Sequence, residues 1–552
     1  MQTWKHAKKM VMILVVSCIF SSTSSGAEGG TFQEVLTEYL EMGPSVRLNI
    51  NAHGKSAEQI DKRLIDIYHK NGFQPFWIEN GKPSRRAQDI IGVLKDAYLH
   101  GLDPASYFIK NIDLYWNSRD KGGLSQLDIL LTLGMMRYVA DQREGRIEPR
   151  QIDEELFATA SDVEIDWDRL RETAFKAPDV KAFLDEQAPS FYQYDELKKR
   201  LAEYRMIAQV GGWPSLPDGQ VLKPGMEDNR LKILRKRLAV TGEIGAEYLE
   251  STTFDPQLVE AVKKFQKRHN LSADGVVGKQ TLAALNVPVS YRIQQIIVNM
   301  ERYRWLKRMP DEKLVAVNIA GFEAVAGRPG AFDISMPVIV GKTYHKTPVF
   351  SDTIKYIVFN PYWTLTPSIA GNETLPKLKK DPHYLKKQNM RIFNGWGPDA
   401  VELDATTIDW SSVSKKNMNR YRIRQDPGPT NALGTLKLVF PNKFNVYMHD
   451  TPAHGLFKQD KRAFSHGCIR MSRPAEMAAW VLGGEAKGWS VERVNEIVAS
   501  KKRTVVNLEK PLPVYILYRT AYFNPEDKAL HFYEDLYGRD ALLAKALFNS
   551  GS

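Results

Sequence analysis

The segment that decides how this chain folds and acts is Ser-His-Gly-Cys-Ile-Arg-Met, residues 465–471. A second segment, Tyr-Met-His-Asp-Thr, residues 447–451, precedes it. A thiol at its free pKa of about 8.5 is mostly protonated at neutral pH, and the thiolate is the nucleophile. A nearby imidazole can accept the proton and hold the charge as an ion pair. We therefore expect His449, at the end of a strand, and Cys468, in a loop, to converge on one reactive site.

The backbone around the cysteine also points to chemistry. Gly467 directly precedes Cys468 and allows the backbone to approach a substrate closely. We expect the amides around Cys468 to face a developing oxyanion. A helix is expected to begin near Pro474, so Cys468 lies ahead of it and gains nothing from the helix dipole.

The sequence around these segments predicts a mostly β domain over residues 314–516. From Leu314 the pattern has period two and is rich in strand-forming residues. Expected strands cover residues 314–319, 334–340 and 354–359, and a hairpin-like pair covers residues 436–440 and 444–448. Between residues 372 and 430 the β pattern lapses. An insertion of this length is often a lid or a binding element, and a solvated loop without a role is the alternative.

The N-terminal part predicts a helical scaffold over residues 31–225. Apolar residues such as Ile60, Leu64 and Tyr68 recur at three- and four-residue intervals, which places them on one helix face. Residues 124–140 are apolar nearly all round but carry charged positions, which favours a buried core helix over a membrane span. No chemical motif stands out in this part.

Residues 228–288 predict a small helical unit. Asp255 is expected to cap a helix whose first turn holds Pro256. A glycine turn and a second short helix follow, and Thr281 is expected to cap that last helix. A generic helical hairpin is the alternative interpretation.

Composition limits the class of protein. The 552 residues predict about three or four domains. Hydrophobic residues make up 43% and charged residues 26%, which excludes a disordered, collagenous or polytopic membrane protein. The net charge of +11 suggests an anionic environment without identifying one. Two cysteines are too few for a disulfide scaffold.

Residues 1–27 have the layout of a signal peptide or anchor. Lysines precede an apolar run over residues 10–20, and small residues follow as far as Ala27. The surroundings of Cys18 loosely resemble a lipoprotein signal. Cleavage after Ala27 would leave Cys468 as the one cysteine of an exported chain, in a compartment where thiols usually pair.

The two quoted segments resemble the L,D-transpeptidase family, with its YkuD-type catalytic domain. That family carries a histidine, a spacer and S-H-G-C before an apolar residue, and His449 and residues 465–469 match this pattern. Residues 265–285 resemble the small three-helix peptidoglycan-binding module. The order of parts is similar to that of the large periplasmic branch. The resemblance implies a multidomain α+β fold, with a helical scaffold, the three-helix module and a mostly β catalytic domain with a long insertion; residues 517–552 are expected to be a helical, peripheral tail.

The resemblance also implies a reaction. Cys468 would attack the carbonyl between the third and fourth residues of a donor stem peptide and release D-alanine. The acyl group would pass to the side-chain amine of a neighbouring stem, which cross-links two third-position residues. His449 would accept the proton. The expected supporting or oxyanion residues are Ser465, His466 and Gly467, and the expected substrate contacts are Tyr447 and Arg470.

One position departs from the family pattern. Many members have glycine after the first histidine, where this chain has Asp450. The carboxylate is expected either to raise the basicity of His449 or to point to solvent. If Cys468 is an activated thiolate, its reaction with electrophiles is expected to have a pH midpoint below the free thiol pKa of about 8.5.

The expected setting is the periplasm, with peptidoglycan stem peptides and glycan as partners. Other cell-wall synthesis proteins and inner-membrane attachment are further expectations; nucleic acid, cofactors and metals are not expected. His449, His454, His466 and Cys468 match no common zinc spacing. The alternatives are an L,D-carboxypeptidase or related hydrolase, attachment of an outer-membrane protein to the wall, and a non-catalytic wall-binding scaffold. In a papain-like peptidase the histidine follows the cysteine. Here His531 follows Cys468, but it lies in the expected tail and is not a suitable partner.

Overall fold

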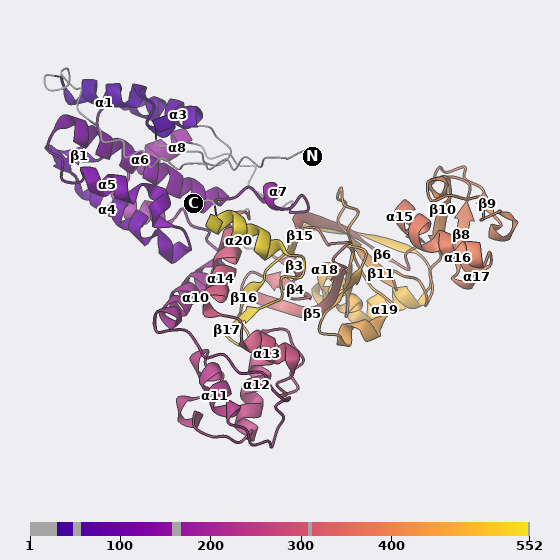
Figure 1. The fold of residues 1–552 in the computed structure, drawn as a ribbon. Coiled ribbons are helices and arrows are strands. Elements are labelled where there is room, and N and C mark those ends of the chain that lie inside the picture. The colour runs from indigo at the N-terminus through magenta and orange to yellow at the C-terminus, as the bar shows by residue number, and fades with distance from the viewer. Residues whose placement is uncertain (1–29, 48–56, 157–166, 307–311, 550–552) are drawn as a thin grey trace, which may run out of the picture.

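The computed structural model of the protein describes residues 30–47, 57–156, 167–306 and 312–549. Figure 1 shows a helical region, a small helical module, and a β-rich domain with a separate lobe on its far side. The expected multidomain α+β class is confirmed. Residues 1–27, with Cys18, lie outside the described residues, so the signal or anchor stays a prediction. Among the described helices, none combines the length and apolar character needed to cross a membrane.

The helical region is organised around one buried helix, α6 (Lys121–Glu144). As expected from its sequence, α6 is buried on nearly all sides. Its Asp128 accepts hydrogen bonds from the Tyr68 hydroxyl at 2.6 Å and the Trp77 amide at 2.8 Å. Burial nevertheless raises the pKa of Asp128 to about 6. The other described elements of residues 30–209 are α1 (Phe32–Glu41), α2 (Pro44–Arg47), α3 (Ala57–Lys70), β1 (Ile78–Glu79), β2 (Lys82–Pro83), α4 (Arg85–Lys95), α5 (Ile109–Tyr115), α7 (Pro149–Ile152), α8 (Trp167–Ala174), α9 (Val180–Asp185) and α10 (Tyr192–Gln209).

The small module contains α11 (Arg230–Val240), α12 (Pro256–Arg268) and α13 (Lys279–Leu285). Asp255 caps α12 by accepting the Leu258 amide at 2.9 Å, as expected. The expected capping role of Thr281 is wrong, because Gly278 is the N-cap and Thr281 lies inside α13. Its buried hydroxyl instead contacts the Gln266 side chain at 3.1 Å.

Helix α14 (Val289–Arg304) leads into a nine-stranded sheet with the order β13-β5-β14-β12-β11-β6-β15-β3-β4. A further pairing of β4 with β5 closes the sheet on itself. The strands are β3 (Leu314–Asn318), β4 (Glu323–Arg328), β5 (Ala331–Gly341), β6 (Phe350–Phe359), β11 (Leu436–Val439), β12 (Met448–His449), β13 (Ala463–Ser465), β14 (Ile469–Met471) and β15 (Thr504–Leu517). Helices α18 (Pro474–Val481) and α19 (Val491–Ala499) complete the domain, and α18 begins at Pro474 as expected.

The hairpin-like pair forms only in part. β11 and β12 are antiparallel, but β12 is two residues long. The Asn442 side chain donates to the carbonyls of Phe440 and Val446 and accepts the amide of Val446. These side-chain bonds replace the ladder bonds that a longer hairpin would need.

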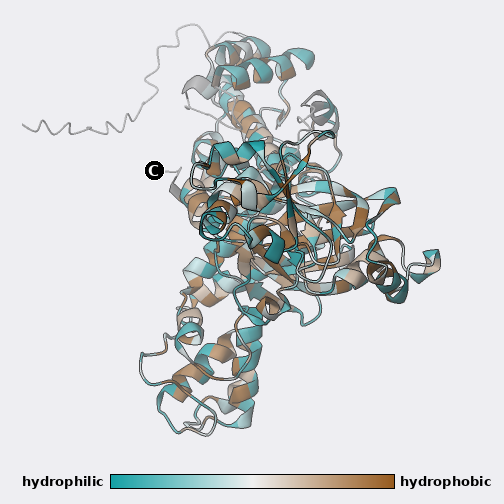
Figure 2. Cartoon of the chain, turned by 90° about the vertical axis from the view of Figure 1, so that its right-hand side faces the viewer, coloured by the Kyte–Doolittle hydropathy of each residue, from teal (hydrophilic) through white to brown (hydrophobic). Residues whose placement is uncertain are grey.

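The insertion folds as a lobe of its own, with short strands in the stretch where the sequence shows no β pattern. The lobe begins before residue 372 and contains β7 (Trp363–Thr364), α15 (Pro367–Ile369), the π-helical turn η4 (Ala370–Thr374), α16 (Leu375–Lys380), α17 (Tyr384–Lys387), β8 (Met390–Phe393), β9 (Glu402–Leu403) and β10 (Arg422–Gln425). The four strands pair in the order β7-β10-β8-β9 around a core that includes Leu378, Ile392 and Trp410. Strands of two to four residues are too short to show a period of two. Figure 2 shows hydrophobic residues within each part of the chain, consistent with separate cores.

The C-terminal segment is neither wholly helical nor peripheral, which corrects the expected tail. It forms β16 (Ala521–Asn524), β17 (Ala529–Phe532) and α20 (Arg539–Asn549). Its residues Tyr522, Phe532 and Leu543 are buried. Two short, mostly apolar runs at 521–523 and 529–533 flank the turn-forming segment 524–528 with its Asn-Pro pair, a hairpin pattern that the expectation of a helix overlooked.

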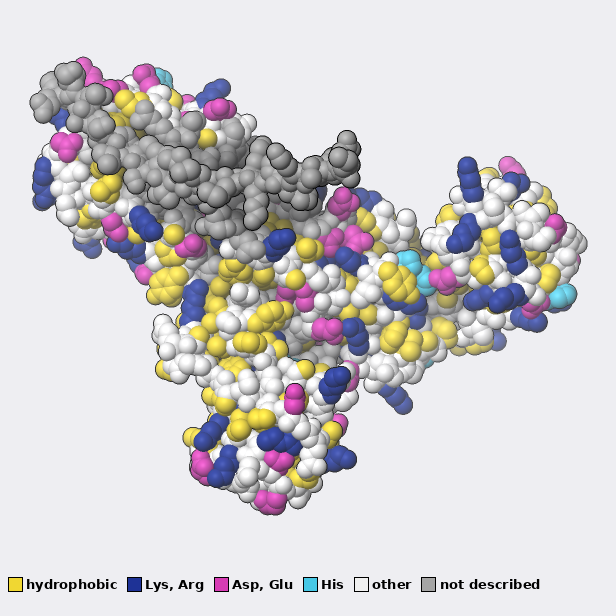
Figure 3. Space-filling view, in the orientation of Figure 1, with side chains coloured by type: hydrophobic (Ala, Val, Ile, Leu, Met, Phe, Trp, Pro, Cys, Tyr) yellow, Lys and Arg dark blue, Asp and Glu magenta, His cyan; other side chains and the backbone are white. Residues whose placement is uncertain are grey.

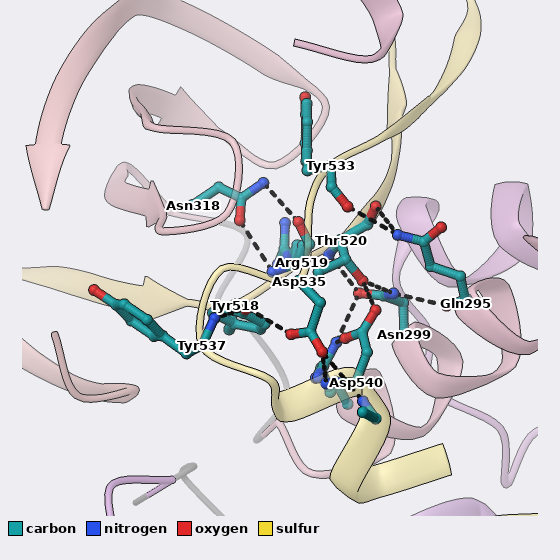
Figure 4. Close-up of polar contacts among 12 residues, drawn as sticks. Gln295, Asn299, Asn318, Tyr518, Arg519, Thr520, Tyr533, Asp535, Tyr537 and Asp540 are labelled. Atoms are coloured by element: carbon teal, nitrogen blue, oxygen red, sulfur yellow. Dashed lines mark hydrogen bonds and ion pairs between the residues drawn. The ribbon is translucent and has the colours of Figure 1, made fainter. Parts of the chain in front are cut away.

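A buried polar network fixes this segment to α14 (Figure 4). Asp540 accepts a hydrogen bond from the Thr520 hydroxyl at 2.5 Å and forms a 2.6 Å ion pair with Arg302. Asn299 donates to the Thr520 hydroxyl at 2.8 Å, and Gln295 donates to the Thr520 carbonyl at 3.0 Å. The end of the chain is therefore part of the folded unit that positions the sheet.

Replacing Asp540 with alanine should lower the free energy of unfolding by about 3 kcal/mol, because Arg302 would stay buried without its partner. Urea unfolding followed by tryptophan fluorescence measures this loss. The exposed Lys461–Glu534 pair supplies the control, since Glu534→Ala should change little. Equal effects of the two substitutions would contradict a structural role for the network.

Candidate active site

Strand pairing brings the two quoted segments together. β12 and β14 are parallel neighbours, with Met448 opposite Ile469 and His449 opposite Arg470. Met448 and Ile469 are fully buried in the core of the domain. Because side chains alternate along a strand, the neighbouring positions face the other way.

We call that opposite side of the sheet the reactive face. It holds side chains from three adjacent strands and the residues beside them: Lys437, Tyr447, His449, Cys468 and Arg470. Lys437 pairs with His449 across β11 and β12, and its Nζ lies 5.0 Å from the centre of the Tyr447 ring. The residues expected to be nucleophile, base and substrate contacts therefore share one surface.

The Cys468 thiol is partly buried on this face. Its sulfur lies 3.7 Å from the Asn445 carbonyl and is hydrogen-bonded by the backbone and side chain of Tyr447. Burial raises the pKa of Cys468, while Tyr447 and the cations Lys437 and Arg470 act in the opposite direction. Since burial dominates, the thiol is neutral at neutral pH. The expected reaction midpoint below the free value disagrees with this direction.

His449 is also neutral in this structure. It is only 4% exposed, and its Nδ1 lies 2.5 Å from the Asp450 carbonyl. A carbonyl only accepts hydrogen bonds, so Nδ1 carries the proton and Nε2 keeps a lone pair. Burial lowers the pKa of His449 to about 3, and the nearby charge of Arg470 acts in the same direction. The contacts of the described residues include none between the imidazole and the Cys468 sulfur, so the pair is not the expected ion pair at rest.

Asp450 has a structural role that neither expectation anticipated. Its carboxylate accepts the amide and hydroxyl of Thr435, both at 2.8 Å, and the amide of Thr451 at 2.7 Å. Gly434 has a φ of 60°, and a Cβ there would collide with the Asp450 carboxyl group. The side chain thus closes the turn before β11, and Asp450 contacts the imidazole through its backbone carbonyl.

The loop before Cys468 is held by side-chain bonds. The Ser465 hydroxyl donates to the Cys468 carbonyl at 2.5 Å and accepts the Gly467 amide at 3.1 Å. Thr347 donates to the Gly467 carbonyl at 2.9 Å. Gly467 has a φ of 109°, which a residue with a Cβ rarely adopts. Among the described contacts, the amides of His466 and Cys468 have no protein acceptor, whereas that of Gly467 is occupied.

The His466 side chain contacts the insertion lobe. Its Nε2 pairs with Glu373 of η4, and its ring lies 5.0 Å from that of His345. Figure 3 shows histidine and acidic side chains where the central domain meets the lobe. Glu373 could not be predicted from the sequence, because nothing in one sequence links positions that far apart.

The remaining histidines do not build a second site here. His454 is exposed, and its Nε2 lies 3.9 Å from the Asp450 carboxylate. Within the part of the chain that the structure describes, no group of three or more His, Cys, Asp or Glu side chains is placed to hold a metal ion.

Comparison with known families agrees with this layout. Residues 62–201 match the family described as "Scaffold domain", and residues 228–285 match "Putative peptidoglycan binding domain". Residues 312–508 match "L,D-transpeptidase catalytic domain". The expected resemblance to the L,D-transpeptidase family is confirmed, including the order of the three parts.

Individual relatives cover parts of the chain. A Haemophilus influenzae protein described as "Putative L,D-transpeptidase" is 32% identical over 286 residues, which are 51% of this chain and 56% of that protein. The chain thus spans little more than half the length of this curated relative.

Solved L,D-transpeptidase structures also match. The protein from Xylanimonas cellulosilytica is 16% identical, with 55% of this chain and 99% of that chain covered and a TM-score of 0.18. The protein from Stackebrandtia nassauensis is 13% identical, with 55% and 96% covered and a TM-score of 0.21.

The electrostatics of the thiol predict how it reacts with iodoacetamide. The labelling rate of Cys468, followed by mass spectrometry of its peptide, should have a pH midpoint above the free value of about 8.5. Tyr447→Phe should move the midpoint higher still, because it removes a hydrogen bond that lowers the pKa of Cys468. Tyr98→Phe, on the scaffold surface, is the matched control. A midpoint near 7 would show that the thiol is ionised at rest.

Proposed function

Starting from the L,D-transpeptidase catalytic domain, we propose that this protein cross-links peptidoglycan through an acyl group carried on Cys468. The observation that carries the proposal is the pairing of β12 with β14, which places Cys468 and His449 on one face. The neighbouring peptidoglycan-binding domain supports peptidoglycan as the partner. The site of action is accordingly the cell wall, reached by export to the periplasm.

The neutral state of both groups suggests the order of proton transfer. As the sulfur attacks the carbonyl carbon, its proton passes to Nε2 of His449. The imidazolium then protonates the departing amine of D-alanine as the peptide C–N bond breaks, which leaves a thioester. The acceptor amine attacks the thioester, loses a proton to His449 and displaces the sulfur, which recovers that proton.

Arg470 fits the role of a substrate contact. Its Nε is buried and has no hydrogen-bond partner among the described residues. Its charge also opposes protonation of His449. A stem-peptide carboxylate bound to Arg470 would offset that charge and make the imidazole a stronger base when substrate is present.

The amides of His466 and Cys468 are the proposed oxyanion donors. Both lack a protein acceptor in the described contacts, and both belong to the loop that Ser465 holds in place. The Gly467 amide is not a donor in this arrangement, because the Ser465 hydroxyl occupies it. Gly467 contributes its backbone conformation instead.

Hydrolysis of the same thioester is the second candidate function. Water in place of the amine would give an L,D-carboxypeptidase, and exclusion of water decides between the two. The contact between Glu373 and His466 favours transfer, because it brings the insertion lobe next to the loop that carries Cys468.

Disaccharide tetrapeptides distinguish these outcomes. The protein should convert them into cross-linked dimers that lack one D-alanine, whereas Cys468→Ala should give no product above background. Mass spectrometry of the products reports the difference. A free tripeptide as the sole product would support hydrolysis, and an active alanine variant would remove Cys468 from the mechanism.

The role of the lobe can be tested at one residue. Deleting residues 372–430 would cut through η4 and leave β7 without its partner β10, so Glu373→Gln is the cleaner change. It should slow cross-linking several-fold, because His466 loses its charged partner. Asp381→Asn, in an exposed pair with Lys387 of the same lobe, is the control. Equal rates for both variants and the parent would contradict a role for the Glu373 contact.

A further inference from the structure

A cavity of about 540 Å³ lies where the helical region meets the closed sheet. Its walls come from the residues that enter α10, from Tyr303 of α14, from β3 and β4, and from the segment after β15. None of the residues that line it belongs to the reactive face. Cavities of roughly 300–1,000 Å³ are the size that holds small ligands.

Strand alternation explains why the cavity is largely apolar. On β3, Val315 and Val317 point into the main core, so Leu314 and Ala316 point the other way. Leu314, Ala316 and Leu517 form a second apolar surface, which lines the cavity. An apolar group that binds here would displace water from this apolar wall, which is favourable.

Two polar groups on the cavity wall are left available. The guanidinium of Arg519 lies over the Tyr303 ring at 4.7 Å, and no carboxylate in the described part of the chain pairs with it. The Tyr303 side chain is 2% exposed, and its hydroxyl has no hydrogen-bond partner there. Buried hydroxyl groups are normally hydrogen-bonded, so this one indicates a missing acceptor.

Three of the other polar side chains around the cavity are already engaged. The Asn318 side chain donates to the Arg519 carbonyl and accepts the Arg519 backbone amide (Figure 4). The Gln193 side chain makes the same two hydrogen bonds with the backbone of Phe523. Glu323 accepts the Ser335 hydroxyl at 2.6 Å. The pKa of Tyr522 is influenced by the nearby Arg519, Glu323 and Tyr303, which places these groups around one part of the cavity.

We propose that this cavity binds a small amphipathic molecule with a single carboxylate group. The carboxylate pairs with Arg519 and accepts the Tyr303 hydroxyl, since guanidinium and carboxylate match in geometry and charge. The apolar body lies against Leu314, Ala316 and Leu517. Glu323 on the same wall disfavours a second negative group. The bound molecule touches the helical region and the catalytic sheet at once.

Isothermal titration of the full chain with 4-phenylbutyrate tests the proposal. It should bind saturably with one site, whereas the matched alcohol, 4-phenylbutanol, should bind at least tenfold more weakly. Absence of saturable binding at millimolar concentration, or equal affinity for acid and alcohol, would overturn the proposal.

Three variants locate the binding. Arg519→Gln should weaken binding at least tenfold, while Arg493→Gln, which removes a surface arginine that lies over Trp489, should not. Tyr303→Phe should weaken binding several-fold without lowering the melting temperature, because its hydroxyl has no partner to lose. Ala316→Phe should fill the cavity and abolish binding. Unchanged affinity in Arg519→Gln would overturn the proposal.

A second readout separates this cavity from the proposed catalytic site. Bound 4-phenylbutyrate should leave the rate of Cys468 labelling unchanged, because the reactive face is not part of the cavity. Protection of Cys468 that persists in Arg519→Gln would assign the binding to the reactive face and refute the cavity. A negative result for the cavity would therefore leave the proposed transpeptidase function untouched.

Discussion

The pairing of β12 with β14 is the constraint on which the rest of the site depends. These strands have two and three residues, so their few backbone bonds do little to hold them. Their stability comes from Met448, Ile469 and Met471, which are fully buried. Burying each such side chain stabilises the fold by about 1.5–3 kcal/mol. Because a slip of one residue would reverse every side chain, this burial also fixes which residues form the reactive face.

The charges of that face shape its chemistry. Lys437 and Arg470 favour a thiolate on Cys468 but disfavour an imidazolium on His449. Burial opposes both charged forms. The result is a neutral pair at rest. In the proposed reaction, negative charge develops on the sulfur only when an acceptor for the proton and a carbonyl carbon are both in place. Such a site holds no charged thiolate in the resting protein.

Contacts between the parts connect the neighbourhood of the reactive face to regions outside the sheet. Glu373 joins the insertion lobe to His466, two residues before Cys468. On another side, Ser272 of the peptidoglycan-binding domain donates to Asp460 at 2.8 Å, in the segment that leads to β13. The segment that leads to Cys468 is therefore contacted by both neighbouring parts.

The sequence predicted the features that depend on local pattern. The buried helix α6, the cap at Asp255, the start of α18 and the change to strands at Leu314 all follow from spacing and residue type. The motif also predicted that Cys468 and His449 meet on one surface.

What the sequence could not predict depends on distant partners. The lobe strands are too short to show a period, and the C-terminal hairpin was taken for part of a helix. The role of Asp450 required knowledge of the turn at Gly434, and Glu373 required the folded lobe. The direction of the pKa shifts followed from burial, which no spacing reveals.

Trapping the acyl-enzyme tests the central claim most directly. Rapid mixing with a disaccharide tetrapeptide, an acid quench and peptide mass spectrometry should show the tetrapeptide minus D-alanine attached to Cys468. In His449→Gln the same adduct should form at about one hundredth of the parent's rate or slower, because no base then accepts the thiol proton. Product formation without an adduct on Cys468, or an equally fast adduct in the His449 variant, would contradict the account.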